Sequence, residues 1–118
     1  MVNTYISFYL KSNRIHVFTV ALRGIGSPNR ICFMLDQDGN RLLLLPHTKK
    51  DFVSHRVPEV VYRGADSLDI SSKKLCRLLA AQHNWDVSRS YRAPGVIVEE
   101  KGLAAFDLSK AEMITKLP

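Results

Sequence analysis

Residues 14–46 read RIHVFTVALRGIGSPNRICFMLDQDGNRLLLLP, and this stretch decides the expected fold. Its first five residues alternate polar and apolar side chains, which predicts a strand with one buried face. A short helix over 19–25 follows, because Thr19 can cap it and the two glycines near its end limit its length. Residues 30–45 then form two apolar arms around a turn rich in Asp and Gly, which predicts a β-hairpin.

The sequence on either side of this stretch adds further elements. Residues 5–10 alternate in the same way, and the Ser-Asn step after them favours an N-terminal hairpin with the strand over 14–18. Residues 47–52 are polar and basic, and we interpret them as a linker. A further strand is expected over 57–62, where a proline indicates an edge position.

The second half of the chain repeats the same order of elements. We expect a strand over 68–70, a helix over 72–83 whose cap is Ser71 or Ser72, and a hairpin over 91–106. The sequence Ser-Lys-Ala-Glu over 109–112 fits a capping box and predicts a short C-terminal helix.

These elements predict one domain spanning residues 1–118. The expected fold class is α+β, with two strand–helix–hairpin units forming a small mixed sheet or barrel, two main helices and the short C-terminal helix. The units, at about 14–46 and 68–108, are interpreted as a pseudo-repeat on pattern alone, because their identity is low.

Charge is distributed unevenly along the 118 residues, whose net charge is +6. Residues 1–64 carry nine basic and four acidic side chains, whereas residues 65–118 carry eight and seven. An excess of +5 in the first half favours anionic partners. Two distant cysteines, Cys32 and Cys76, fit reduced core thiols in a cytoplasmic protein. Neither a signal peptide nor a membrane span is expected.

The sequence offers no catalytic, metal or cofactor motif. The four histidines (His16, His47, His55 and His83) are not at metal-ligand spacing from one another or from the cysteines. The acidic residues around Gly39 lack the later ligands of a calcium loop, and a hairpin turn explains them. No Gly-rich phosphate loop is present. We therefore expect a protein that is not an enzyme and that needs no cofactor or metal.

The quoted stretch resembles an AbrB-type swapped-hairpin module. The resemblance rests on the Leu22-Arg23 step, the Ile25-Gly26 pair that ends the helix and the Asp38-Gly39 turn of the hairpin. Such modules interdigitate in pairs into a small barrel, from two chains or, in MraZ-like proteins, from two units of one chain. The resemblance implies DNA binding by Arg and Lys side chains near the strand–helix junctions, and a possible homodimer.

Eight basic residues are candidate contacts for phosphates because they flank these junctions or the second helix and hairpin. They are Arg14, Arg23, Arg30, Lys73, Lys74, Arg77, Arg89 and Arg92. The expected function is a small basic DNA-binding protein, for example a transcriptional regulator. The alternative is a protein-interaction module or inhibitor encoded on a mobile element, which would bind an acidic or nucleic-acid-binding host protein.

Overall fold

The structure is a computed structural model that describes residues 2–49, 51 and 53–115. It contains one antiparallel sheet, two α-helices and three short 3₁₀ helices. In chain order these are β1 (Val2–Tyr9), β2 (Arg14–Phe18), α1 (Thr19–Gly24), β3 (Arg30–Leu35), β4 (Arg41–Pro46), β5 (Ser54–Arg56), η1 (Glu59–Arg63), β6 (Ser67–Ser71), α2 (Lys73–His83), β7 (Ser90–Val98), η2 (Glu99–Lys101), β8 (Leu103–Asp107), η3 (Leu108–Lys110) and β9 (Glu112–Ile114).

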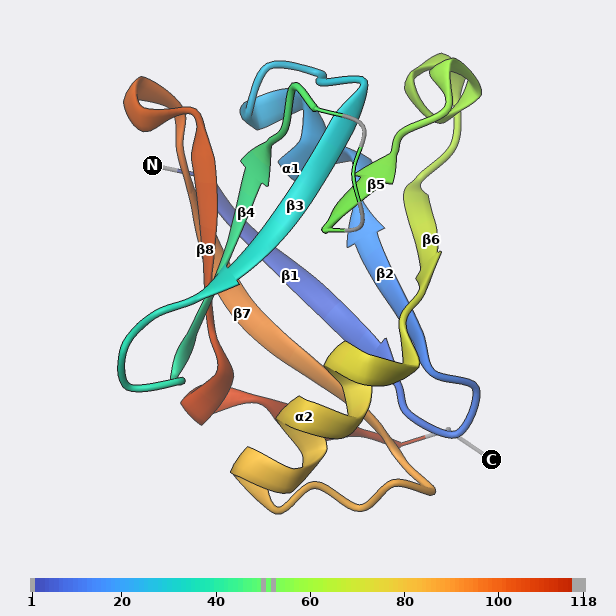
Figure 1. The fold of residues 1–118 in the computed structure, drawn as a ribbon, viewed down its shortest axis with the longest axis vertical. Helices are drawn as coiled ribbons and strands as arrows, with labels where there is room; N and C mark the ends of the chain where they lie inside the picture. Colours follow the sequence, from blue (N-terminus) through green and yellow to red (C-terminus); the bar gives the residue numbers. More distant parts are fainter. Residues whose placement is uncertain (1, 50, 52, 116–118) are drawn as a thin grey trace.

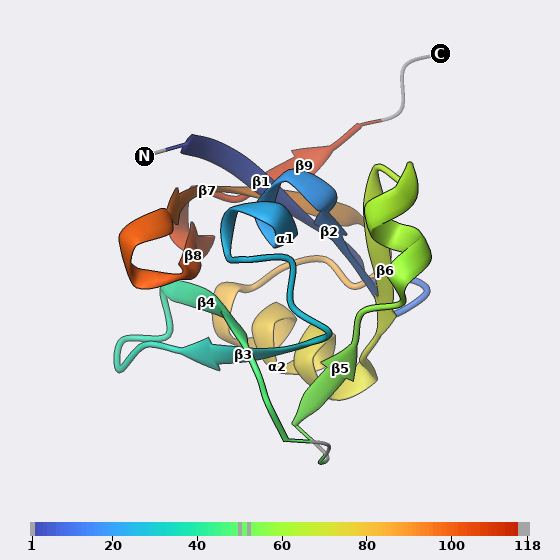
Figure 2. The same cartoon turned by 90° about the horizontal axis from the view of Figure 1, so that it is seen from above.

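The strands form one sheet in the order β5-β3-β4-β8-β7-β1-β2-β6, with β9 added beside the start of β7. Every pairing among the described residues is antiparallel. The sheet curls into a nearly closed barrel, with α1 at one end and α2 at the other (Figure 1). The view from above shows the strands as a ring around the core (Figure 2).

This architecture shows that the predicted fold class was wrong. The described part of the chain is mostly antiparallel sheet, and α2 is the one substantial helix in it. The helix α1 has only six residues, because it ends at Gly24 and the chain turns at Gly26, where φ is 103°. Pairing between distant strands, rather than helices on a mixed sheet, therefore organises the chain.

Two of the three pairs of equivalent strands in the predicted units are neighbours in the sheet, while β3 and β7 are not paired with each other within the described residues. The strand β2 pairs with β6 about the central His16–Asp69 pair, and β4 pairs with β8 so that Leu43 lies opposite Ala105. Such antiparallel pairing of equivalent strands is what a two-fold relationship between the units requires. The duplication itself stays a prediction.

The barrel interior is filled by alternate residues of its strands and closed at the ends by the helices. The largest of its fully buried side chains are Phe8, Phe106, Ile6, Leu10, Ile15, Leu22, Ile31, Leu42, Leu44, Leu79, Ile97 and Leu108. Close packing also depends on Gly95: a Cβ there would lie 2.4 Å from Cδ1 of Phe106 and 2.6 Å from the Ala105 oxygen. The missing side chain lets the Phe106 ring approach β7.

Two predicted elements have a different structure. The expected C-terminal helix is replaced by η3 and β9, since Asp107 rather than Ser109 caps the turn and residues 112–114 pair with β7. The expected strand over 57–62 is largely the 3₁₀ helix η1, which begins directly after Pro58. Of the predicted linker over 47–52, residues 50 and 52 lie outside the described residues.

One of the two predicted helix caps is confirmed, and the other is wrong. Ser72 caps α2, and its side chain accepts a hydrogen bond from the Leu75 amide. Thr19, by contrast, is the first residue of α1, and its hydroxyl donates to the Ala65 carbonyl over 2.7 Å. Thr19 therefore joins α1 to the residues before β6 instead of capping its own helix.

Candidate nucleic-acid interface

An exposed tyrosine stands on the outer face of the barrel beside an arginine from the neighbouring strand. Ile6 and Phe8 of β1 point into the core, so Tyr5 lies on the opposite face of the sheet, where it is 50% exposed. The guanidinium carbon of Arg92 on β7 lies 5.6 Å from the centroid of the Tyr5 ring. This distance is within the range of a cation–π interaction.

Two hollows meet along β1 at Asn3, Thr4 and Tyr5. The first has a volume of about 750 Å³ and lies over β4, β8, β7 and β1. The second has a volume of about 700 Å³ and is bounded by β1, the start of α1, residues 65–66 and Arg92. Together they form one surface, which we call the β1 groove.

The β1 groove carries more basic than acidic side chains. Its five basic residues are Arg23, Arg41, Arg92, Lys101 and Lys110, and its two acidic residues are Asp66 and Asp107. Asp107 accepts hydrogen bonds from the amide and the hydroxyl of Ser109, and these bonds are the main reason why its pKa is lowered. Five positive charges against two negative ones give the groove a net charge of +3, which favours an anionic ligand.

The structure brings together two of the eight predicted contact residues in this groove. Arg23 and Arg92 both line the second hollow, and Arg23 also donates to the Tyr62 carbonyl over 2.9 Å. Tyr91 does not act as the aromatic partner of Arg92, because adjacent strand residues face opposite sides. It is buried, and its ring stacks on Trp85 at 5.0 Å.

Four of the remaining predicted residues belong to α2 or pair in register with the residue before its cap, and α2 covers the end of the barrel opposite α1 (Figure 1). Lys73, Lys74 and Arg77 belong to α2. Arg14 at the start of β2 pairs in register with Ser71, just before this helix, and forms an ion pair with Asp69. The junction arginines Arg14 and Arg23 therefore lie at opposite ends of β2, and they do not converge on one ligand.

The other two predicted residues each have a partner of their own. Arg89 lies between α2 and β7, with its Nε 4.0 Å from a carboxylate oxygen of Asp86. Arg30 at the start of β3 donates from its Nε to the Ser54 hydroxyl over 2.9 Å.

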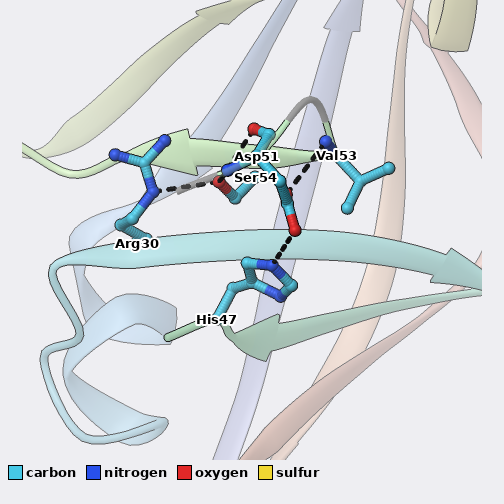
Figure 3. A network of polar contacts seen from close by, with 5 residues as sticks. All are labelled: Arg30, His47, Asp51, Val53 and Ser54. Carbon is cyan, nitrogen blue, oxygen red and sulfur yellow. Dashed lines mark hydrogen bonds and ion pairs between the residues drawn. The ribbon is translucent and has the colours of Figure 1, made fainter. Parts of the chain in front are cut away.

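Arg30 belongs to a polar network on the outer side of β3 and β5 (Figure 3). Ser54 also bonds to the backbone of Asp51, whose carboxylate lies 2.9 Å from Nε2 of His47. The hydrogen bond from His47 is the main cause of the lowered pKa of Asp51. The neighbouring Cys32 thiol has a raised pKa, because it is buried and because the Asp51 charge is near. A thiol kept protonated is a poor nucleophile, so the network holds the chain in place rather than activating Cys32.

A serine, a histidine and an aspartate lie side by side on β1, β2 and β6. In the strand register, Ser7 lies opposite His16, and His16 lies opposite Asp69. The carboxylate of Asp69 lies 3.2 Å from Nε2 of His16. However, the Ser7 hydroxyl is fully buried and has no hydrogen-bond partner among the described residues. A nucleophilic serine needs a hydrogen bond to its base and access to substrate, so this row does not form a catalytic triad.

The sequence reasoning missed Tyr5, Arg41, Lys101 and Lys110 as candidate contacts. The alternation that assigns Ile6 and Phe8 to the core also places Tyr5 on the outer face, and this was the available signal. The three basic residues lie near turns, and only the pairing of β4, β8, β7 and β1 brings them to one surface.

Within the described part of the chain, no three His, Cys, Asp or Glu side chains are grouped so that they could hold a metal ion. No helix among the same residues is long and apolar enough to cross a membrane. Comparison with protein-family models, curated proteins and solved structures finds no match to this chain.

Proposed function

We propose that this protein binds nucleic acid through the β1 groove. The observation that carries the proposal is the exposed Tyr5 ring with Arg92 beside it, in a groove that has five basic and two acidic side chains. Guanidinium and ammonium groups bind phosphates without regard to sequence, and an exposed ring offers a surface for a base.

Three further features support the same class of ligand. The net charge of +6 favours association with a polyanion. Residues 15–46 resemble AbrB-type modules, whose members bind DNA. The Lys73, Lys74 and Arg77 side chains of α2 form a second basic region, which adds attraction at long range without belonging to the groove. With DNA as the nucleic acid, the proposal extends to a role in transcriptional regulation.

The test is binding of fluorescent oligonucleotides, followed by anisotropy over a series of salt concentrations. Contacts with several phosphates predict that the affinity falls steeply with salt, with a log–log slope of about −0.7 to −0.9 for each phosphate neutralised. Failure to bind single strands and duplexes even at low salt would overturn the proposal.

Two matched variants locate the site, since each removes three positive charges. Replacing Arg41, Arg92 and Lys101 by alanine should lower the affinity by at least about tenfold and flatten the salt slope. Replacing Lys73, Lys74 and Arg77 by alanine should have a smaller effect, because these side chains lie outside the groove. Equal losses in the two variants would mean that attraction is general and that the groove is not the site.

A second candidate function, a protein-interaction module, is favoured by the edge of β1. Within the described residues, Val2–Tyr5 pair only with β7, because β2 pairs with β1 from Ile6 onward. An unpaired strand edge can accept a strand from another protein. A stoichiometric partner from host lysate that protects the amides of Val2–Tyr5 from hydrogen exchange would support this candidate.

A further inference from the structure

The β1 groove has an apolar floor and a basic rim. The floor is built from outward-facing strand residues that are partly or largely exposed: Tyr5, Leu43, Pro94, Val96, Leu103 and Ala105. They alternate along the strands with buried Ile97, Ala104 and Phe106. A ligand that fills the groove therefore places apolar or aromatic surface on the floor and negative charge at the rim.

A double helix does not match this arrangement. Its base faces are stacked inside, and its surface presents phosphates, so it can touch the basic rim but offers no base face to Tyr5. An unpaired strand does match, because its bases can turn toward the floor while its phosphates reach the arginine and lysine side chains.

The Tyr5 ring is positioned to receive a base. The Arg92 guanidinium lies over the Tyr5 ring, and Tyr5 is 50% exposed. A cation–π contact favours one orientation of an exposed ring, which reduces the conformational entropy that the ring loses when a base stacks on it. The guanidinium beside it can bind the phosphate of the same nucleotide.

We propose that the natural ligand of the β1 groove is single-stranded nucleic acid, held by stacking of one base on Tyr5 and by phosphate contacts at the rim. This inference rests on the proposed function, since it specifies the form of nucleic acid that the groove takes. Unpaired DNA and unpaired RNA share the chemistry that it needs.

The experiment compares three labelled probes of the same mixed sequence: single-stranded DNA, single-stranded RNA and duplex DNA. Each is titrated with the full chain at one moderate salt concentration and followed by anisotropy. The inference predicts that at least one single strand binds about tenfold more tightly than the duplex. The tighter of the two single strands identifies the sugar that is preferred.

Two Tyr5 variants test the stacking contact. Tyr5→Leu should weaken single-strand binding by about tenfold, whereas Tyr5→Phe keeps the ring and should bind within about threefold of the unmodified protein. A single strand that contains 2-aminopurine gives a second readout, because stacking quenches its fluorescence, and the quenching should disappear in Tyr5→Leu. Circular dichroism checks that both variants fold.

The outcomes separate this inference from the proposed function. If the duplex binds as tightly as the single strands and Tyr5→Leu has no effect, the single-strand inference is wrong while nucleic-acid binding stands. If none of the three probes binds even when the titration is repeated at low salt, both are wrong.

Discussion

The Arg92 guanidinium carbon lies 5.6 Å from the centroid of the Tyr5 ring, on strands that come from opposite ends of the chain. The pairing of β1 with β7 creates this contact, because Ser7 lies opposite Arg92 and Tyr5 lies opposite Pro94. Tyr5 and Arg92 are therefore diagonal neighbours on one face of the sheet, a separation that long and aromatic side chains can span.

Arg92→Ala should reduce nucleic-acid binding with little change in stability. The side chain is exposed, so its contact with Tyr5 contributes about 0.5–1 kcal/mol to folding at most. Binding should fall by about fivefold or more, since a phosphate contact and an ordering contact are both lost. Anisotropy measures the loss of binding, and thermal unfolding of the same sample measures the change in stability. Arg92→Lys is the matched control, because it keeps the charge but not the planar group.

Gly95→Ala should destabilise the barrel by about 1–3 kcal/mol, as overpacking of a core does. The new Cβ would lie 2.4 Å from Cδ1 of Phe106 and 2.6 Å from the carbonyl oxygen of Ala105, and the backbone oxygen cannot turn away as a side chain can. Denaturant unfolding measures the loss.

The control for this substitution is Val96→Ala, which changes a partly exposed neighbour on the same strand. Val96→Ala should lower the free energy of unfolding by less than Gly95→Ala does. A Gly95→Ala protein as stable as the unmodified chain would show that β7 and β8 are less closely packed than the structure indicates.

Burial raises the pKa of the Cys76 thiol from 9.0 to about 11. The Cys76 thiol therefore holds its proton more strongly in the folded state than in the unfolded state. Its contribution to stability is complete below pH 9 and is lost as the pH rises from 9 through about 11, by an amount of about 2 kcal/mol.

The Cys76 effect can be isolated by comparing the unmodified protein with Cys76→Ala. Because other groups titrate equally in both proteins, the difference in unfolding free energy between them should shrink across this alkaline range. A difference that stays constant between pH 8 and pH 11 would contradict the burial of this thiol.

The His47–Asp51 contact should make stability depend on pH in the acid range. The pKa of Asp51 lies below its ordinary value of 3.8, chiefly because His47 is hydrogen-bonded to it. A carboxyl with a lowered pKa stabilises the fold above its unfolded pKa, and this contribution is lost as the pH falls through the folded value. The unmodified protein should therefore melt at a higher temperature than Asp51→Asn at pH 6, and the difference should narrow as the pH falls below 3.8.

Local sequence signals were sufficient where an element depends on its own residues. The hairpin of β3 and β4 follows from two apolar arms around an Asp-Gly turn, and α2 follows from its Ser72 cap and the spacing of its apolar residues. Where pairing with a distant strand competes with a local preference, the structure predicted from the sequence was wrong. Residues 109–112 have the pattern of a capping box, yet residues 112–114 form a strand beside β7.

The candidate site was only partly predictable for the same reason. Arg23 and Arg92 were expected as contacts from their charge and position, but Tyr5, whose ring lies beside Arg92, was not. A sequence shows which strand residues share a face, whereas the register between β1 and β7 decides which of them meet. The grouping of Arg41, Lys101 and Lys110 likewise depends on strand order in the barrel.

The most direct test of the β1 groove as the binding site is an NMR titration of the ¹⁵N-labelled protein with a short single-stranded oligonucleotide. The largest amide shift changes should lie in β1 around Tyr5 and in β7 and β8, and α2 should change little. Changes concentrated at Lys73, Lys74 and Arg77, with β1 unaffected, would contradict the assignment of the β1 groove as the binding site.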